Sequence, residues 1–299
     1  MSWFVSTWRF LKRVYEGYDN HAVGDSAATL GYYFLFSLFP FLFFLAPLTA
    51  FIPQVGGSIQ RLLHTAHAFL PPQAMAIIEP YLLDLVTAAH PHLPTLGLAI
   101  AIYSGSRGIN AVRIAFNRAY AVKESRPFWK TELLAYGITV GGGLLLLVGV
   151  AALVAGGSVG LWAARHLYLD RAFVAVLVWI RWPIIILAIM LGAGLCYYLL
   201  PDVKQRFRFI VPGAAIGTLA WLIASWGFET YVSDFGRYNI TYGSIGGVVV
   251  LLTWFYITGF ILLMGGEVNA IIETMSPGGK AIGERSFAGT DVRLKPEIL

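Results

Sequence analysis

The stretch that decides the fold is Ala28–Ile52, ATLGYYFLFSLFPFLFFLAPLTAFI, an apolar run of membrane-spanning length. It forms the centre of the segment Ser26–Gln60, which contains no Asp, Glu, Lys or Arg. A helix needs about 20 predominantly apolar residues to cross the hydrocarbon core of a bilayer. Backbone polar groups in lipid must be satisfied within the segment, and a helix does this. We therefore expect a transmembrane helix here.

Five further segments lack acidic and basic residues: Leu85–Ser106, Leu133–Ala164, Trp182–Pro201, Phe209–Phe228 and Tyr238–Gly266. Histidines and prolines shorten the apolar part of the first of these, so its helix must continue through Arg107 toward Asn117. Hydrophobic residues make up 58% of the chain and charged residues 12%, about half the roughly 25% that is usual in soluble domains. The sequence predicts an all-α, polytopic membrane protein with six transmembrane helices.

The distribution of basic residues predicts the orientation of these helices. With both termini in the cytoplasm, sixteen of the 21 Lys and Arg residues fall on the cytoplasmic side and four fall outside, while Arg181 lies within the fourth segment. Cytoplasmic loops of membrane proteins carry such an excess of Lys and Arg. The first apolar stretch starts too late and runs too long for a cleaved signal peptide. We expect both termini to be cytoplasmic.

Three regions lie outside the spans. Residues 1–24 place Phe4, Trp8, Leu11 and Tyr15 on one helical face, opposite a basic face, which is typical of an amphipathic helix in the inner membrane interface. Residues 53–92 have helical periodicity on both sides of two prolines, which predicts an outer helical hairpin between the first two spans. Residues 276–299 are polar and glycine-rich, so we expect a mobile cytoplasmic tail after a membrane domain of residues 1–275.

Polar residues gather on one face of the first span, namely Ser26, Thr29, Tyr33 and Ser37, together with Pro40. Polar side chains facing lipid would lose their hydrogen bonds, so this face is expected to point toward other helices or water. Thr29, Tyr33 and Ser37 are therefore candidates for one wall of a polar pathway. The alternative is ordinary hydrogen bonding between helices.

The end of the second span carries a basic and polar face formed by Arg107, Asn110, Arg113, Asn117 and Arg118. On one continuous helix near the inner interface, these residues are suited to bind phosphate or carboxylate groups. The alternative is that the basic residues only follow the positive-inside rule. That rule does not explain the two asparagines, so this face is a candidate substrate site.

Glu267, near the end of the sixth span, is a candidate for a gate or an ion pair, and Asn269 follows it closely. An unpaired carboxylate at the membrane margin is costly. We therefore expect Glu267 to contact at least one of Arg107, Arg113 or Arg118. Such a pair would be either a gate or a structural clamp.

A second candidate gate lies toward the outer side. Arg181 stands between two tryptophans, which mark membrane interfaces. It either reaches the outer headgroups or faces the bundle, opposite Glu229 or Asp234. The glycine-rich stretch Glu229–Gly247, which includes Tyr242, is either part of an outer gate or a plain loop.

Motifs for other chemistries are absent from the sequence. There is no Walker-type phosphate loop, no Gly-x-Ser-x-Gly elbow and no His-Glu-x-x-His motif. No nucleophile and base can be paired by spacing. His64 and His67 lie one helical turn apart in the outer loop, with His90 and His92 nearby, but no carboxylate stands at ligand spacing, so a metal site there is disfavoured. We therefore expect no enzymatic activity, no cofactor, no metal and no nucleic-acid partner.

Seven short motifs occur in a fixed order: Ala27–Tyr33 with Ser37–Pro40, Ala115–Tyr120 with Arg126–Lys130, Tyr198–Pro201, Val211–Ala214, Tyr242–Gly246, Trp254–Tyr256 and Gly265–Ala270. In combination, they resemble the YihY/BrkB family of membrane proteins over roughly residues 10–275. The resemblance implies a bacterial inner-membrane protein with six spans. It also implies links to envelope integrity, virulence and lipid handling. The family was once labelled ribonuclease BN, an activity against which the absence of a cytoplasmic acidic or histidine cluster argues.

Two functions follow from these observations and the resemblance. The first is transport of a lipid or another anionic amphiphile by a flippase or exporter, whose headgroup would engage Arg107, Asn110, Arg113 and Asn117. Without a nucleotide motif, transport would be passive or driven by an ion gradient. The alternative is a non-transporting scaffold for envelope assembly. A polar cavity open to lipid would favour transport, whereas a dry core would favour the scaffold. Membrane lipids are expected partners in either case, and the sequence also allows a homo-oligomer.

Overall fold

The computed structural model describes residues 2–48, 63, 75, 79–80, 83, 93–146, 171–234 and 239–286. Every regular element within these ranges is a helix, as predicted. The named helices are α1 (Ser2–Asn20), α2 (Val23–Leu48), α5 (Leu93–Ala119), α7 (Arg171–Leu199), α8 (Phe207–Asp234) and α9 (Asn239–Met275). A further helical segment covers residues 128–146.

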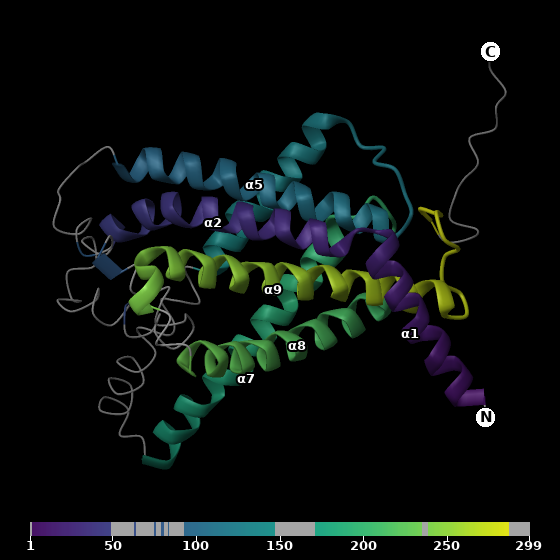
Figure 1. Cartoon of the computed structure of the whole chain (residues 1–299). Helices are drawn as coiled ribbons and strands as arrows, with labels where there is room; N and C mark the ends of the chain where they lie inside the picture. The colour runs from purple at the N-terminus through teal and green to yellow at the C-terminus, as the bar shows by residue number, and fades with distance from the viewer. Residues whose placement is uncertain are drawn as a thin grey trace.

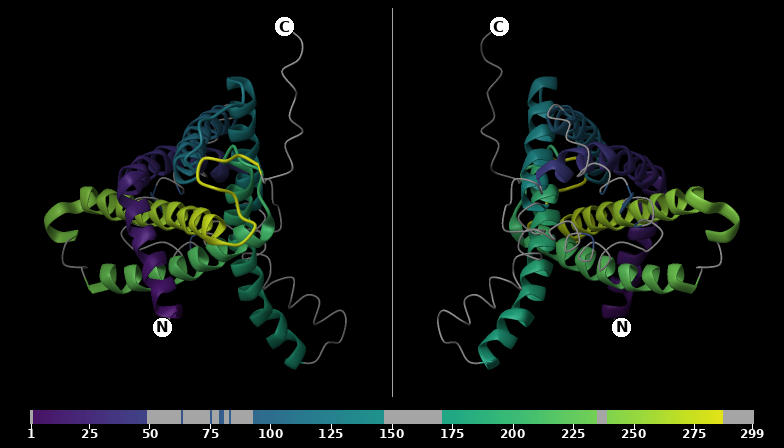
Figure 2. Two further views of the ribbon diagram at one scale, coloured as in Figure 1. Left: turned by 90° about the vertical axis from the view of Figure 1, so that its right-hand side faces the viewer. Right: turned by 90° about the vertical axis from the view of Figure 1, so that its left-hand side faces the viewer.

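Helix α9 is central to the arrangement and packs against α1, α2, α5 and α8 (Figure 1). Helices α2 and α5 lie side by side, and α7 crosses the bundle steeply beside α8 (Figures 1 and 2). The starts of α2 and α8 and the ends of α5, α7 and α9 meet at one end of the bundle, here called the basal end. Helix α1 projects from this end at an angle.

Helices occur at all six segments where spans are expected. Within the described residues, Phe207–Val232 and Gly246–Met275 are long and apolar enough to cross a membrane. Large apolar side chains such as Ile184, Leu219 and Ile223 are exposed on the surface, which is where lipid would solvate them. The full count of six spans stays a prediction. The outer hairpin expected at residues 53–92 lies almost wholly outside the described residues.

Two local features of the helices agree with the sequence. Helix α5 continues unbroken through Arg107 to Ala119, as the short apolar part of the second span requires. Helix α1 covers most of the expected amphipathic segment and exposes Trp8 and Tyr15. Its interfacial position stays a prediction. One residue of the junction between α1 and α2, Ala22, adopts a left-handed backbone conformation with φ of 51°.

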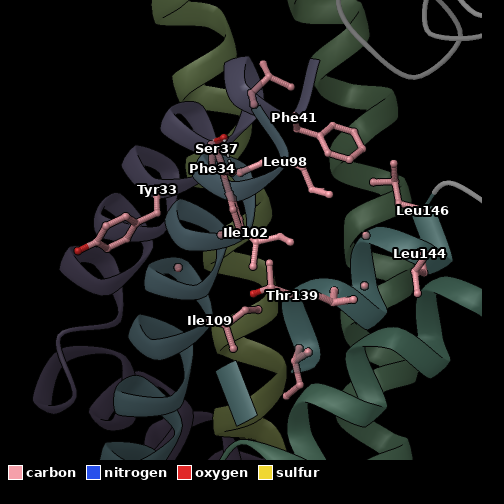
Figure 3. Close-up of a pocket in the computed structure, with 18 of the residues that line it drawn as sticks. Tyr33, Phe34, Ser37, Phe41, Leu98, Ile102, Ile109, Thr139, Leu144 and Leu146 are labelled. Carbon is pink, nitrogen blue, oxygen red and sulfur yellow. Dashed lines mark hydrogen bonds between the residues drawn. The ribbon is translucent and has the colours of Figure 1, made fainter. Parts of the chain in front are cut away.

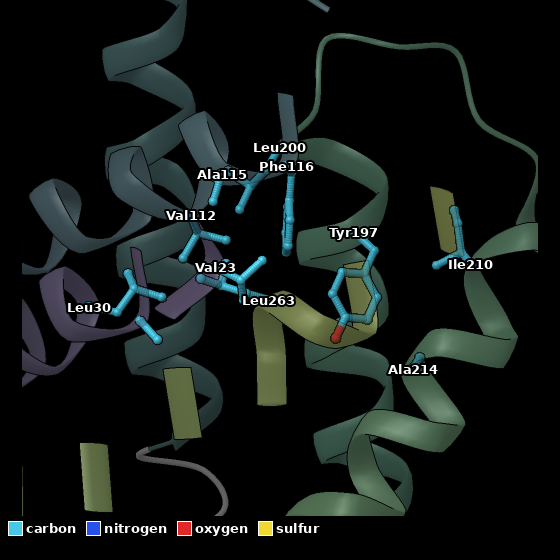
Figure 4. Close-up of a cluster of buried hydrophobic side chains, with 11 residues drawn as sticks. Val23, Leu30, Val112, Ala115, Phe116, Tyr197, Leu200, Ile210, Ala214 and Leu263 are labelled. Atoms are coloured by element: carbon cyan, nitrogen blue, oxygen red, sulfur yellow. The ribbon is translucent and has the colours of Figure 1, made fainter. Parts of the chain in front are cut away.

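The core lies toward the basal end and draws residues from five helices (Figure 4). It includes Leu30 of α2, Phe116 of α5, Tyr197 of α7 and Leu263 of α9, all of which are buried. Dense packing of such side chains leaves little room for changes of volume.

The tightest helix contact brings α7, α8 and α9 together at two glycines. A Cβ atom at Gly213 would lie 2.2 Å from the carbonyl oxygen of Gly265, and one at Gly265 would lie 2.1 Å from the hydroxyl of Tyr197. Tyr197 donates a hydrogen bond of 2.9 Å to the carbonyl of Leu262. Small residues permit this close approach, so Gly213 and Gly265 are packing positions between these helices.

Candidate functional site

Two cavities flank the contact between α2 and α5. The first has a volume of about 510 Å³ and is lined by α2, α5, α9 and the segment 128–146. Its lining is largely apolar but includes the hydroxyl groups of Ser37 and Thr139 (Figure 3). The second, of about 790 Å³, is lined by α2 and α5, and Arg107 is the charged residue in its lining. Tyr33 contributes to both cavities.

The polar face expected on the first span is only partly directed into these cavities. Ser37 lines the first cavity, and its hydroxyl donates to the carbonyl of Phe34 at 3.1 Å. Thr29 is exposed, donates to the carbonyl of Asp25 at 3.0 Å, and lines neither cavity. The hydroxyls of Ser37 and Thr29 therefore bond within their own helix rather than to neighbouring helices.

The guanidinium of Arg107 forms an ion pair with Glu132 of the segment 128–146. Asn110 donates to the same carboxylate at 3.0 Å. Arg107 also lies over the ring of Tyr103, at 5.3 Å from its centre. Its Nε atom is buried and has no hydrogen-bond partner among the described residues. Arg107 is therefore a largely neutralised cation at the edge of an apolar cavity.

A second carboxylate, Glu124, compensates the end of α5. Arg113 forms an ion pair with Glu124. Asn117 donates a hydrogen bond of 3.1 Å to it, and the guanidinium of Arg126 donates two, of 2.7 and 3.0 Å. Burial raises the pKa of Glu124, but the hydrogen bonds from Arg126 and Arg113 outweigh this and lower its pKa to about 2. Asn117 also accepts a hydrogen bond of 2.8 Å from the amide of Asp202.

The chain reverses direction after α5, and this reversal brings Glu124 back to the side chains at the end of that helix. Helix α5 ends at Ala119, and Ala121 in the following turn has a left-handed φ of 52°. The amides of Ala121 and Val122 donate to the carbonyls of Arg118 and Asn117 at 2.9 Å each, an arrangement typical of left-handed helix ends. The face expected to attract anions is thus covered by acidic residues from the following segment. Sequence reasoning missed Glu124 and Glu132, although they are the only acidic residues between Arg107 and Leu146.

Glu267 has a different partner from the one expected. Its side chain is 3% exposed, and its Oε1 atom lies 2.7 Å from Nδ1 of His21. The expected ion pair with Arg107, Arg113 or Arg118 is not found among the described residues, where Arg107 and Arg113 pair instead with the carboxylates Glu132 and Glu124. The hydrogen bond to Glu267 raises the pKa of His21, while burial and the nearby Arg118 act against this rise.

The remaining candidates do not gather at one site. Asn269 is fully buried and accepts a hydrogen bond of 2.7 Å from the amide of Gly213, which joins α9 to α8. Glu229 is exposed on α8. Arg181 and Tyr242 belong to α7 and α9, but their side chains lie outside the described residues. The structure therefore assembles no outer gate from the residues it describes.

Residues 276–286 differ from the expectation of a mobile tail. They fold back under the basal end, where the amide of Gly283 donates to the carbonyl of Tyr120 at 3.2 Å. Lys280 forms a buried ion pair of 2.9 Å with Glu273. The glycines that indicated flexibility instead provide turns, since Gly278 and Gly283 have φ values of 74° and 83°.

The described part of the chain contains no group of three or more His, Cys, Asp or Glu residues that could hold a metal ion. Its single cysteine, Cys196, has a free thiol in α7. Polar chemistry in this region thus consists of ion pairs and hydrogen bonds at the basal end, next to two largely apolar cavities.

Comparisons with known proteins agree with this picture of a helical membrane protein. A family model described as virulence factor BrkB matches residues 14–287. A putative ribonuclease-like protein, YfkH of Bacillus subtilis, is 35% identical over 88% of this chain and 94% of its own length. A UPF0761 membrane protein of Chromohalobacter salexigens is 28% identical over 90% of this chain and 64% of its own length. One of Alteromonas mediterranea is 26% identical over 86% of this chain. No solved structure matches.

Proposed function

The chain belongs to the virulence factor BrkB family of membrane proteins, and we propose that it transports a lipid or another anionic amphiphile across the membrane. It would act as a flippase or exporter, passively or driven by an ion gradient. We propose further that it has six spans in a bacterial inner membrane, with both termini in the cytoplasm. It would work without enzymatic activity, with membrane lipids as partners.

The observation that carries this proposal is the cavity between α2 and α5 with Arg107 in its lining. An amphiphile needs an apolar surface for its chain and a counter-charge for its headgroup. The cavity offers Leu35, Phe36 and Ile100 for the chain and the guanidinium of Arg107 for the headgroup. A guanidinium suits phosphate and carboxylate because it donates two parallel hydrogen bonds to either group.

When no substrate is bound, Glu132 balances the charge of Arg107. A charge that is removed from water must be paired, and Glu132 compensates Arg107 while Asn110 orients the carboxylate. An anionic headgroup would compete with Glu132 for the guanidinium. Release of Glu132 would then loosen the contact between α5 and the segment 128–146. Substrate binding and helix movement would be coupled in this way.

The experiment compares lipid movement in vesicles that contain purified protein. Transbilayer movement of labelled anionic lipid should be faster than in protein-free vesicles. Arg107→Gln should slow it about ten-fold, the loss expected for one charge-assisted hydrogen bond of about 1.5 kcal/mol. Arg118→Gln is the matched control, because Arg118 is exposed on the same helix and lines neither cavity. Equal rates with and without protein, across several lipid classes, would count against transport.

The ion pairs of the basal end favour the second candidate, an envelope scaffold. Arg113, Glu124 and Arg126 hold one another in a compact network that a rigid platform would also need. Filling the cavity separates the two functions. Ile100→Trp should abolish transport and any envelope phenotype that depends on it. A scaffold would keep the envelope phenotype in a variant that still folds.

A further inference from the structure

A further cavity, of different character from the two beside α2, lies at the basal end, where α7 ends and α8 begins. Its volume is about 660 Å³, and its lining comes from three separate segments of the chain. Its polar lining includes Arg126, Asp202, Lys204, Gln205 and Arg285. Unlike the cavities beside α2, it is lined as much by polar as by apolar groups.

Hydrogen bonds between the three segments fix the shape of this cavity. The amide of Lys204 donates to the carbonyl of Arg285 at 2.7 Å, and the guanidinium of Arg285 donates to the carbonyl of Lys123 at 2.6 Å. Ser125 donates to Asp202 through its amide at 2.8 Å and through its hydroxyl at 2.6 Å. The backbone of Lys204 and the guanidinium of Arg285 are thus held in place before any ligand arrives, which reduces the cost of binding.

The charges of the cavity leave a positive excess. Among the described residues that line it, three are basic and only Asp202 is acidic. The carboxylate of Asp202 already accepts a hydrogen bond from the hydroxyl of Ser125. Its oxygens lie 3.7 Å from the Nε atoms of Arg126 and Arg285. Lys204 is exposed, and the side chain of Arg285 is 47% exposed. Asp202 pairs with Arg285, and Glu124 pairs with Arg126. Lys204 therefore supplies the excess positive charge, beside the half-exposed guanidinium of Arg285.

One further donor lacks a partner. The amide nitrogen of Gln205 is buried and has no hydrogen-bond partner among the described residues, and Gln205 lines the same cavity. A buried donor left unsatisfied is costly. Because this nitrogen is enclosed by protein, it would reach an anion in the cavity only after the side chain rotates, while Lys204 and Arg285 supply the charge.

The surroundings of the cavity point to a lipid as the source of this anion. Tyr198, which lines the cavity, stacks on Phe207 with ring centres 4.9 Å apart. Phe207 is 67% exposed, and the neighbouring Leu199 is also exposed. Exposed aromatic rings beside basic residues are typical of the level of lipid headgroups. Basic pockets between membrane helices bind anionic headgroups by this combination.

We propose that this cavity binds the phosphate of an anionic phospholipid, with Lys204 and Arg285 on the phosphate and the acyl chains along Tyr198, Leu199 and Phe207. The site is separate from the cavities beside α2 and does not depend on transport. The bound lipid joins the loop after α5, the turn between α7 and α8, and the segment after α9. It therefore stabilises the basal end.

The test measures lipid binding to the full-length protein in detergent. Phosphatidylglycerol is titrated while the midpoint of thermal unfolding is followed, and native mass spectrometry counts the lipids that remain bound. The double variant Lys204→Gln with Arg285→Gln should bind this lipid about 25-fold more weakly, because each basic residue contributes about five-fold to the attraction of anionic lipid. Lys204→Arg with Arg285→Lys keeps both charges and should bind as the original protein does.

Two comparisons control for charge and for the source of the phosphate. Arg118→Gln with Lys130→Gln removes the same charge from exposed positions outside the cavity and should bind the lipid normally. Glycerol phosphate should give no stabilisation at concentrations where phosphatidylglycerol does. Equal weakening in both double variants would overturn the proposal, because attraction would then be nonspecific. If glycerol phosphate stabilised the protein as fully as the lipid does, the cavity would bind a soluble phosphate compound and the proposal of a phospholipid would be wrong.

Discussion

His21 Nδ1 lies 2.7 Å from Glu267 Oε1, and this contact joins the junction of α1 and α2 to the last turns of α9. Helix α1 passes close to the same carboxylate, since a Cβ atom at Gly17 would lie 2.9 Å from Glu267 Oε2. The pair is therefore a polar connection between the end of the N-terminal helix and the bundle.

Removing His21 should destabilise the protein more than removing both partners. His21→Ala leaves the carboxylate of Glu267 buried without compensation, which should cost about 2 kcal/mol. The double variant His21→Ala with Glu267→Gln avoids that cost and should resemble Glu267→Gln alone. The midpoint of thermal unfolding in detergent measures the difference. Equal midpoints for His21→Ala and the double variant would mean that the pair carries no such energy.

The contribution of His21 to stability should fall as the pH rises. The pKa of His21 in the folded protein lies above its ordinary value of 6.5. A raised pKa gives stability that is fully present below the unfolded value and is lost as the pH rises through the folded value. The midpoint of thermal unfolding should be higher for the original protein than for His21→Gln. This difference should be largest at about pH 6 and smaller at about pH 9. A constant difference would contradict this.

Glu124 should show the opposite dependence. Its pKa falls from 4.5 to about 2 in the folded protein, so its contribution is present above 4.5 and is lost as the pH falls toward 2. Glu124→Gln also leaves Arg113 and Arg126 without their carboxylate, and should cost about 1–2 kcal/mol at neutral pH, since part of the network is exposed. Glu229→Gln, at an exposed position on α8, is the control and should leave the unfolding midpoint unchanged.

Two glycines of α8 should respond very differently to a methyl group. Gly213→Ala places a Cβ atom 2.2 Å from the carbonyl oxygen of Gly265, so α8 and α9 must separate. We expect a loss of about 3 kcal/mol or failure to accumulate in the membrane. Gly227→Ala meets nothing within 4 Å and should be neutral or slightly stabilising, because alanine favours the helix. Similar losses for both would show that the close contact does not limit stability.

The sequence predicted the parts of the fold that depend on local patterns. The apolar runs and their spacing indicated helices at the six segments, and the short apolar part before Tyr103 indicated that α5 had to continue past Arg107. The face of α1 that carries Trp8 and Tyr15 followed from a periodicity of 3.6 residues. These features depend on neighbours along one helix, so they are visible without knowing what packs against it.

The partners of the charged residues could not be predicted in the same way. Glu267 had several basic residues within reach in principle, and the choice of His21 depends on the direction in which α1 leaves the bundle. Glu124 reaches Arg113 because Ala121 turns the chain back, and nothing in the composition of that loop indicates a left-handed alanine. Likewise, Gly278 and Gly283 looked like markers of flexibility but form defined turns.

The left-handed alanine between the first two helices has a consequence for how the protein sits in a bilayer. Only two residues separate α1 from α2, and Ala22 holds a conformation that costs a residue with a side chain about 1 kcal/mol. Such a short junction lets neither helix turn independently of the other. If the aromatic face of α1 rests on the membrane surface, then the tilt and depth of α2 are set by that surface. We expect the composition of the surface to influence the inclination of the whole bundle.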